Sequence, residues 1–221
     1  MIRKSLLALG LLLGSHIAIA QALPEKYQEG VHYFKIDQAP ARTDSNSIEV
    51  TEVFSYACTH CNTFDPFVLS WRERQPENVR FNRIHVSFGR REWELMARGY
   101  IAAEMMGIAE ESHAAMMDAF WKQRKQFRNP EELAAFYAGF GVSPESFLAN
   151  YKSFAADSQL RKSVRDVQVF GVNGTPSMVV NRKYRVGSSK DVPGFEAILD
   201  VVDFLIARET AAQAFASQPD S

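Results

Sequence analysis

The sequence predicts an α/β protein in which a mixed β-sheet is combined with a long, purely helical segment. Two runs rich in β-branched and aromatic residues, 48–55 and 79–86, lie on either side of a helical pattern, which favours a βαβ unit. A hairpin pattern at 177–186 precedes a last helix, which favours a mixed sheet covered by helices. Between them, residues 92–170 are dominated by Ala, Met, Glu, Lys and Leu. The 221 residues are 46% hydrophobic, as expected for one globular core.

The charge of the chain gives no reason to expect nucleic acid as a partner. Lysine and arginine number 25 against 26 aspartate and glutamate, so the formal net charge is -1, and both signs are mixed along the sequence. A domain that binds nucleic acid carries a basic patch instead. Charge therefore says little about function.

The first 20 residues are typical of a signal peptide for export. Arg3 and Lys4 precede an apolar run at 6–13, and residues 18–20 provide small alanines for cleavage. The apolar run is shorter than the about 20 residues that a membrane-spanning helix needs, which argues against a retained anchor. We therefore expect residues 1–20 to be removed and the mature protein to be soluble outside the cytoplasm.

Residues 21–91 are predicted to form the first part of the sheet and the helix beside it. An alternating pattern at 31–36 indicates an edge strand, and the run at 48–55 indicates a buried central strand that leads directly to the cysteines. The next helix is expected to begin at Thr59. Apolar residues recur in it at helical spacing, although Pro66 is expected to kink or interrupt it.

Residues 92–170 are predicted to form an inserted helical domain of four or five helices. Breaks between them are expected at Gly107, Asn129-Pro130, Gly141 and Ser143-Pro144. Serine is a frequent N-cap and proline is frequent at the first helical position, so Ser143 is expected to cap a helix that begins at Pro144.

Residues 171–209 are predicted to complete the sheet and to cover it. A hairpin is expected from strands at 177–180 and 183–186. A last helix at 193–208 and a tail at 210–221 follow it. The hairpin turns through Asn181-Arg182. The tail consists mostly of small and polar residues, so we expect it to be disordered.

The two cysteines of the chain, Cys58 and Cys61, are the strongest functional signal. Two residues separate the cysteines, and at the start of a helix this spacing places both sulfurs in the first turn. Unpaired backbone N–H groups and the positive end of the helix dipole stabilise a thiolate at the first sulfur, so Cys58 is expected to be the nucleophile. Cys61 lies one turn further in and is expected to resolve mixed disulfides. We therefore predict a redox-active disulfide between Cys58 and Cys61.

Other interpretations of the pair are weaker. A purely structural disulfide that closes so short a loop contributes only about 2 kcal/mol in the chain-entropy model. Zinc usually has a second Cys or His pair at matching spacing, and haem attachment needs His where Asn62 stands. No metal or other cofactor is therefore expected. His60 lies between the sulfurs and would stabilise the thiolate by charge or a hydrogen bond, unless it is an exposed loop residue without a role.

Two stretches of the sequence resemble the DsbA family of bacterial periplasmic thiol–disulfide oxidoreductases. The first is 52–61, with Phe54, Ser55, Cys58, His60 and Cys61, and the second is Gly174-Thr175-Pro176 with Met178-Val179-Val180-Asn181. The order of predicted elements also agrees, so the resemblance covers nearly all of the mature chain. It implies a thioredoxin fold with a helical domain inserted between the second and third core strands. It also implies a strong oxidase whose partners are unfolded exported proteins and a membrane reoxidase of the DsbB type.

The resemblance also assigns roles by position. Cys58 and Cys61 match the catalytic pair, and His60 matches the histidine that stabilises the thiolate. Pro176 matches a proline with a cis peptide bond beside the disulfide. Such a bond would turn the backbone of Thr175 outward, where an extended substrate can pair with it. An ordinary trans proline in a turn is the alternative.

Glu52 and Arg83 align with the family's buried acidic and basic pair beneath the site. Glu52 is then expected to exchange a proton with Cys61, whereas an exposed glutamate at a strand end is the alternative. Thr59 departs from the proline of the best-known members and restores a backbone N–H at the helix start. We expect the protein to remain an oxidant, because His60 and the helix terminus persist.

Two further histidines receive no role from the sequence. His85 alternates with Arg83 on one strand face, where a solvated strand end is at least as good an interpretation as a place in the site. His113 has no partner in the sequence. The methionines and aromatic residues of the helical segment are expected mostly in the core, since exposed apolar patches are the exception.

We therefore predict a monomeric, exported dithiol oxidase of the periplasm that introduces disulfides through Cys58. A reductase or isomerase of the same fold is one alternative, although the about 25 residues between the expected cleavage point and the central strand are too few for a dimerisation domain. A binding protein or chaperone with a structural disulfide is the other.

Overall fold

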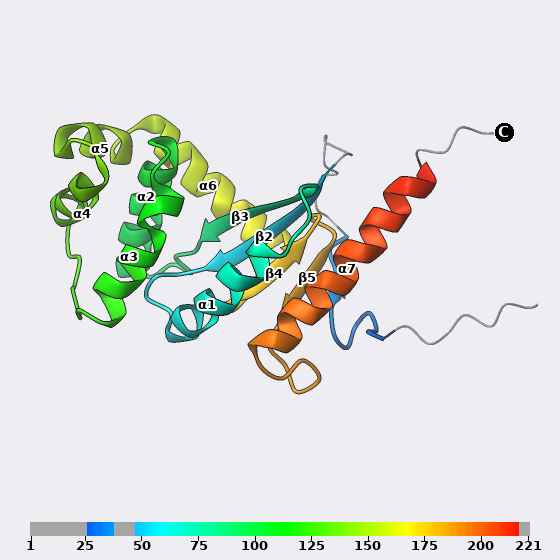
Figure 1. Ribbon diagram of the computed structural model, residues 1–221. Helices are drawn as coiled ribbons and strands as arrows, with labels where there is room; N and C mark the ends of the chain where they lie inside the picture. Colours follow the sequence, from blue (N-terminus) through cyan, green and yellow to red (C-terminus); the bar gives the residue numbers. More distant parts are fainter. Residues whose placement is uncertain (1–25, 38–46, 217–221) are drawn as a thin grey trace, which may run out of the picture.

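The computed structural model describes residues 26–37 and 47–216, so the predicted signal peptide lies outside the described residues. Five strands and a set of helices make up this part of the chain (Figure 1). The strands are β1 (Phe34–Lys35), β2 (Ile48–Phe54), β3 (Val79–His85), β4 (Ser177–Val180) and β5 (Tyr184–Gly187). The helices are α1 (Thr59–Glu73), α2 (Arg91–Met105), α3 (Ala109–Trp121), α4 (Pro130–Tyr137), the short 3₁₀ helix η1 (Ala138–Phe140), α5 (Pro144–Tyr151), α6 (Phe154–Val169) and α7 (Phe195–Ala216).

The five strands form one mixed sheet in the order β1-β5-β4-β2-β3. Strand β2 lies inside the sheet, parallel to β3 and antiparallel to β4. Strands β4 and β5 form the predicted antiparallel hairpin, and β1 pairs with β5 at the edge. The predicted mixed sheet is therefore confirmed, and the long helical segment lies between β3 and β4.

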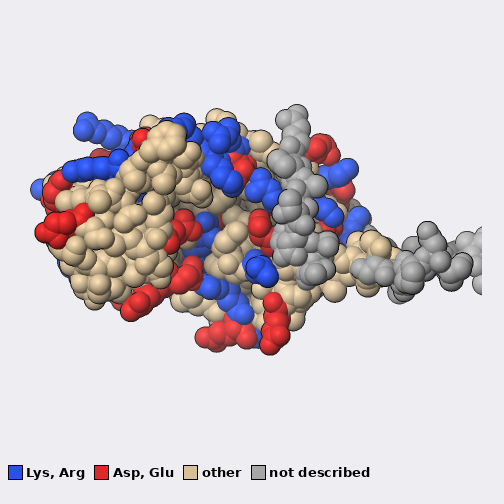
Figure 2. Space-filling model, turned by 90° about the horizontal axis from the view of Figure 1, so that it is seen from above, with Lys and Arg blue, Asp and Glu red and all other residues tan. Residues whose placement is uncertain are grey.

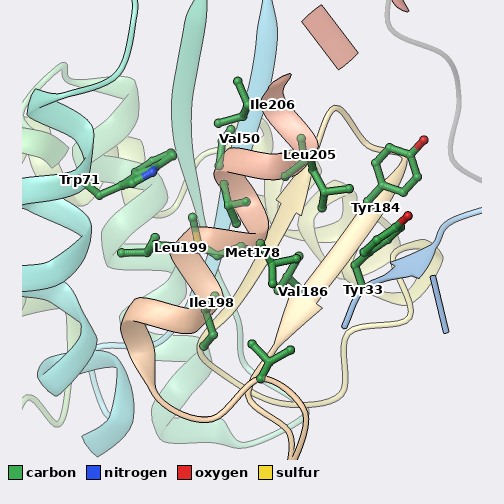
Figure 3. Packing of buried hydrophobic residues seen from close by; sticks show 14 of the residues in the cluster. Tyr33, Val50, Trp71, Met178, Tyr184, Val186, Ile198, Leu199, Leu205 and Ile206 are labelled. Carbon is green, nitrogen blue, oxygen red and sulfur yellow. The ribbon is translucent and has the colours of Figure 1, made fainter. Parts of the chain in front are cut away.

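The two faces of the sheet are covered by different helices (Figure 1). Val50 and Met178 point toward α1 and α7, where they pack with residues such as Leu199 in the largest apolar core (Figure 3). Val53 and Val179, on the opposite face, pack against the last turns of α6 and the segment after it. Alternation along β2 and β4 thus buries both faces, as expected for central strands.

Helices α2 to α5 of the inserted segment lie beyond the ends of β2 and β3 that lead into α1 and α2, while α6 runs back along the sheet (Figure 1). The Ser143 side chain accepts a hydrogen bond from the Ser146 N–H, and Pro144 is the first residue of α5, so the predicted cap is confirmed. Helix α2 is the centre of the block, because Ala97 and Ile101 pack against α6 while its other face joins α3, α4 and α5. The ends of β2 and β3 that lead into α1 and α2 are therefore next to a packed layer of helices.

The hairpin between β4 and β5 turns where the sequence predicts. Asn181 and Arg182 have φ values of 53° and 58°, and the Lys183 N–H donates to the Val180 carbonyl at 2.9 Å. Two central residues with positive φ closed by this bond define a type I′ turn, which matches the twist of a two-stranded ribbon.

Two local expectations about the first part of the sheet need correction in part. The edge strand is confined to Phe34–Lys35, because the chain turns at Gly30 (φ 79°) and its N–H donates to the Tyr33 carbonyl. Helix α1 runs without interruption through Pro66, so the expected interruption is absent, whereas the expected kink stays a prediction. Proline removes one backbone bond there, while the apolar face of the helix, including Phe64 and Trp71, remains buried against the sheet.

The last helix continues to Ala216, so the predicted disorder is wrong for residues 210–216. The remainder of the predicted tail lies outside the described residues. The extension is rich in alanine, which favours helix, and it follows a firm anchor. Glu209 is 3% exposed and accepts hydrogen bonds from Asn181 at 2.5 Å and from Lys183 at 2.7 Å. This contact ties the helix to the hairpin turn.

Charged side chains of both signs are interspersed on the face of the molecule drawn in Figure 2. This distribution agrees with the formal net charge of -1. Among the described helices, none combines the length and the apolar character that a membrane crossing requires.

We predict that Glu209→Ala destabilises the protein by about 1–3 kcal/mol, because it removes the buried carboxylate that accepts hydrogen bonds from the Asn181 amide and from Lys183. Urea unfolding followed by circular dichroism measures the loss. Asp200→Ala, at an exposed position of the same helix, is the control and should stay within about 0.5 kcal/mol of the parent. Equal unfolding midpoints for the parent and Glu209→Ala would contradict the anchoring role.

Candidate active site

Cys58 occupies the N-cap of α1, directly after the central strand β2. Its backbone is extended (φ -95°, ψ 115°), and its N–H donates to the Ser55 carbonyl at 3.0 Å, which closes a turn between strand and helix. The Cys58 sulfur accepts the Cys61 N–H at 3.3 Å. Both cysteines are free thiols and are buried, so the structure describes the reduced pair. The sulfur thus takes the place of the usual capping oxygen.

The surroundings of Cys58 stabilise its thiolate. A hydrogen bond from the Cys61 thiol lowers the pKa of Cys58 most, and burial opposes it. The Thr175 side chain and the backbone N–H groups of Cys61 and His60 lower the pKa further, to about 6. Hydrogen bonds to the charged form outweigh desolvation here, so Cys58 is largely ionised at neutral pH.

The surroundings of Cys61 have the opposite effect. Burial raises the pKa of Cys61 far above its ordinary value, and the hydrogen bond to Cys58 and the negative charges of Cys58 and Glu52 raise it further. Its side chain is 0% exposed. Cys61 therefore keeps its proton while Cys58 is a thiolate, and the two sulfurs have the distinct properties that an attacking and a resolving thiol require.

The loop before β4 lies against Cys58, although 117 residues separate the two in sequence. The Cys58 sulfur lies 3.5 Å from the Thr175 carbonyl oxygen, to which the thiol donates when it is protonated. The peptide bond between Thr175 and Pro176 is cis, as predicted, and Pro176 is buried. The two stretches that carry the family resemblance are thus brought together at one sulfur.

The side chains of Thr59 and His60 are exposed. The backbone N–H of His60 is one of the groups that lower the pKa of Cys58. The charge or hydrogen bond that the sequence suggests for the His60 imidazole stays a prediction. Thr59 is the first residue of α1, and its carbonyl accepts the Thr63 hydroxyl at 3.1 Å, so the residue fits the helix start without proline.

Glu52 and Arg83 form a buried ion pair, and the charge of Glu52 acts on Cys61. The Arg83 Nε donates to Glu52 Oε2 at 2.8 Å, and the two side chains are 0% and 1% exposed. The same guanidinium contacts Asp65 at 3.3 Å and Glu110 at 3.0 Å. Burial alone would lower the pKa of Arg83, but attraction to Glu52 and Glu110 raises it above the ordinary value. Arg83 is therefore the permanent cation of a buried cluster.

The cluster continues to a histidine that sequence reasoning missed. His113 Nε2 lies 2.9 Å from Asp65 Oδ1, and its Nδ1 lies 3.2 Å from the Tyr56 hydroxyl. Burial raises the pKa of Asp65, but the hydrogen bond from His113 and the attraction of Arg83 outweigh burial and hold this pKa below its usual value. Within the described residues, every buried side-chain nitrogen and oxygen has a partner. The network is thus fully satisfied, which a buried polar cluster requires.

His85 is buried, so the interpretation of a solvated strand end is wrong. Its Nε2 accepts the backbone N–H of Tyr56 at 3.0 Å, and its Nδ1 lies 3.1 Å from the Val86 carbonyl. Burial lowers the pKa of His85 to about 3, so the ring is neutral and Nδ1 carries the proton. Alternation along β3 placed His85 correctly beside Arg83 but could not show what covers that face.

Tyr56, two residues before Cys58, has hydrogen-bond contacts with three side chains. Besides His85 and His113, the Trp121 indole N–H donates to the Tyr56 carbonyl at 2.8 Å. Tyr56 itself is 0% exposed. Two of these three partners, His113 and Trp121, belong to α3. The inserted helical block therefore fixes the turn that presents Cys58.

Comparison with known proteins agrees with this geometry. Residues 49–200 match the family of DSBA-like thioredoxin domains. The thiol:disulfide interchange protein DsbA of Pseudomonas aeruginosa is 36% identical over 214 residues, which cover 96% of this chain and 97% of that protein. The protein of the same name from Azotobacter vinelandii is 36% identical over 192 residues, which cover 86% of this chain and 88% of that protein.

Solved structures show the same fold. The crystal structure of Pseudomonas aeruginosa DsbA covers 86% of this chain and 97% of its own, with a TM-score of 0.77 and 36% identity. The oxidoreductase DsbA from Xylella fastidiosa covers 81% of this chain and 96% of its own, with a TM-score of 0.75 and 35% identity. The predicted thioredoxin fold with a helical insertion is therefore confirmed, and the chain belongs to the family of DsbA-like thioredoxin domains.

Proposed function

We propose that this chain is an exported dithiol oxidase that donates its Cys58–Cys61 disulfide to folding proteins. The opposite shifts of the two thiol pKa values carry the proposal, because a merely structural disulfide does not need one stabilised thiolate and one protonated neighbour. Members of the family act as thiol–disulfide oxidoreductases, and so does this chain. The direction of transfer follows from the thiolate, since a sulfur that is stable as an anion is a good leaving group.

The reaction proceeds in two exchanges. A client thiolate attacks Cys58, the bond between the two cysteines breaks, and the electron pair and a proton go to Cys61. A second client thiolate then attacks its own sulfur in the mixed disulfide, and Cys58 leaves as a thiolate. In total, the two client thiols lose two electrons and two protons. The cysteine pair gains the two electrons; one proton is bound by Cys61, and the second proton is released to solvent. A membrane reoxidase of the DsbB type takes the electrons onward.

The supporting residues have roles in the same scheme. Glu52 relays to Cys61 a proton taken from solvent or from the client thiol, and Arg83 holds the Glu52 carboxyl group in place. The backbone of Thr175, next to Pro176, pairs with an extended stretch of the client beside Cys58. The protein works as a monomer in the periplasm, where unfolded exported proteins are its clients and no cofactor besides its own disulfide is needed.

Removal of one cysteine at a time tests the proposed exchange. In Cys61→Ala, the Cys58 thiolate attacks the disulfide between a one-cysteine client peptide and thionitrobenzoate, the thionitrobenzoate anion leaves, and the mixed disulfide with the peptide persists because the internal resolving thiol is missing. Mass spectrometry under non-reducing conditions should detect this adduct. Cys58→Ala, which retains only the buried Cys61, is the matched control and should give almost none. Equal adduct from both variants would refute the assigned division of roles.

Glu52→Gln tests the proton transfer. We expect reduction of the Cys58–Cys61 disulfide to slow by on the order of 10²-fold, because general acid–base catalysis contributes at least that much when a positioned carboxyl group supplies the proton. Stopped-flow tryptophan fluorescence across pH 5–8 measures the rate and its pH profile. Glu49→Gln, on the same strand and paired in register with Arg80, is the control. Exchange rates that stay equal to the parent's at every pH would count against the role of Glu52.

A further inference from the structure

One histidine of the inserted helical block bridges the segment that carries both cysteines. His113 lies in α3 and is 2% exposed. Its Nε2 lies 2.9 Å from Asp65 Oδ1, and its Nδ1 lies 3.2 Å from the Tyr56 hydroxyl. Tyr56 belongs to the turn before α1, and Asp65 belongs to α1 itself. The two contacts of this imidazole, called the His113 bridge below, therefore lie on either side of Cys58 and Cys61 in sequence.

One neutral form of the imidazole satisfies both contacts. Burial opposes the ionisation of Asp65, but the bond from His113 and the attraction of Arg83 keep its pKa below the usual value, so this carboxylate accepts. Burial raises the pKa of Tyr56 well above the usual value, so its hydroxyl keeps the proton and donates. A ring with its proton on Nε2 donates to Asp65 and accepts from Tyr56 at Nδ1. Because donor and acceptor belong to one rigid ring, the bridge fixes how its two partners lie relative to each other.

Aromatic packing holds the imidazole itself in place. The centroid of the His113 ring lies 5.3 Å from that of Phe54, the last residue of β2, and 5.3 Å from that of Tyr56. Phe54 and Tyr56 are both 0% exposed. The ring therefore cannot turn away from its hydrogen-bond partners without opening a close-packed layer, which is unfavourable.

The direction of the Cys58 sulfur depends on the turn in which Tyr56 lies. The Cys58 N–H donates to the Ser55 carbonyl at 3.0 Å, so Tyr56 is inside the turn that this bond closes. On the other side, the Cys58 sulfur accepts the Cys61 N–H of α1 at 3.3 Å. A hydrogen bond weakens steeply when donor and acceptor are misaligned. A shift of the turn relative to α1 would therefore weaken the bonds that stabilise the Cys58 thiolate.

We propose that His113 is a positioning residue for thiol–disulfide exchange, which holds the turn before Cys58 and the body of α1 in the arrangement where the helix N–H groups reach the sulfur. It acts through Tyr56 and Asp65. Without the bridge, the Cys58 thiolate is less well bonded and is a poorer leaving group when the client disulfide forms. This inference rests on the proposed oxidase function and adds a residue that supports the same reacting sulfur from α3.

His113→Leu removes both hydrogen bonds of the bridge while it keeps an apolar side chain in the layer. Asp65 retains its contact with Arg83 at 3.3 Å, which supports folding of the variant. We expect the acid dissociation constant of Cys58 to fall about 10-fold, the effect of about one lost hydrogen bond to an anion. The ultraviolet absorbance of the thiolate, followed between about pH 4 and 9, measures this constant. It reports Cys58 alone, because burial raises the pKa of Cys61 far above its ordinary value.

The equilibrium with glutathione gives a second measurement on the same variant. A less stable Cys58 thiolate stabilises the reduced protein less, so the protein becomes a weaker oxidant. At pH 8, where the parent Cys58 is ionised, the equilibrium constant for oxidation of the protein by oxidised glutathione should rise about 10-fold. A residue that only adds stability to the fold would change neither the thiol titration nor this equilibrium.

Variants that break one bond at a time complete the design. Tyr56→Phe removes only the hydroxyl and keeps the ring that packs on His113, so we expect a smaller loss of acidity, about 3-fold. His113→Gln, whose amide can still donate to Asp65, should restore a similar part of the His113→Leu loss. The double variant Tyr56→Phe/His113→Leu should equal His113→Leu alone, because both changes remove the same contact.

Ile101→Ala is the control for a general loss of stability. Ile101 is 3% exposed and packs between α2 and α6, in a cluster separate from the one that contains the cysteines. Its truncation destabilises the protein by leaving a cavity but does not alter the bridge. We expect its Cys58 titration and its glutathione equilibrium to match those of the parent. All variants are compared at a temperature where their circular dichroism spectra show them to be folded.

The outcomes separate this inference from the proposed function. A parent with an acidic Cys58, together with unchanged titrations in both His113→Leu and Tyr56→Phe, would overturn the positioning role and leave the proposed function intact. An equal loss of acidity in Ile101→Ala, or fully additive losses in the double variant, would overturn it as well. If Cys58 of the parent titrates like an ordinary thiol, the proposed function fails and the positioning role falls with it.

Discussion

The N–H groups at the start of α1 are the constraint on which the site depends. Helix geometry leaves these donors without partners inside the helix, and here the Cys58 sulfur accepts one of them, from Cys61, at 3.3 Å. An anion is favoured at this position by direct hydrogen bonding and by the helix dipole. The remaining features of the site can be understood as ways to keep that sulfur in place, to keep its neighbour neutral and to bring a client to it.

The inserted helical block keeps the sulfur in place. Helix α3 supplies His113 and Trp121 to Tyr56, and its Glu110 neutralises Arg83 from the surface side. Strand β3 supplies Arg83 and His85 to the same layer. The turn before Cys58 is thus bonded to two parts of the chain that are distant in sequence. A thioredoxin-like sheet with α1 alone would leave these polar groups without partners, which is costly in a buried layer.

Most of the site was predictable from short stretches of the sequence. The spacing of Cys58 and Cys61 at a helix start needs no tertiary information, and the family resemblance located Pro176 and the Glu52–Arg83 pair. The partners of His85 and His113 were not predictable, because they depend on how β3 and α3 pack over Tyr56. Periodicity shows which face of a strand a residue occupies, but it does not show what lies on that face.

The misjudged elements follow the same logic. The interruption expected at Pro66 did not occur because the buried face of α1 outweighs one lost backbone bond. The end of α7 was misplaced because the small polar residues after Thr210 suggest a tail, whereas the buried Glu209 anchors the helix to the hairpin turn. Tertiary contacts made by single side chains decided both cases, and composition does not reveal such contacts.

The pH dependence of thiol alkylation tests the central claim most directly. The rate of reaction of the reduced protein with iodoacetamide should rise through a midpoint near pH 6, the pKa of Cys58, with the label found on Cys58 alone. Because this pKa is lowered, the stabilisation of the folded thiolate is complete above the ordinary thiol pKa of 9.0 and is lost as the pH falls through about 6. A midpoint near 9, or equal labelling of Cys61, would contradict the account.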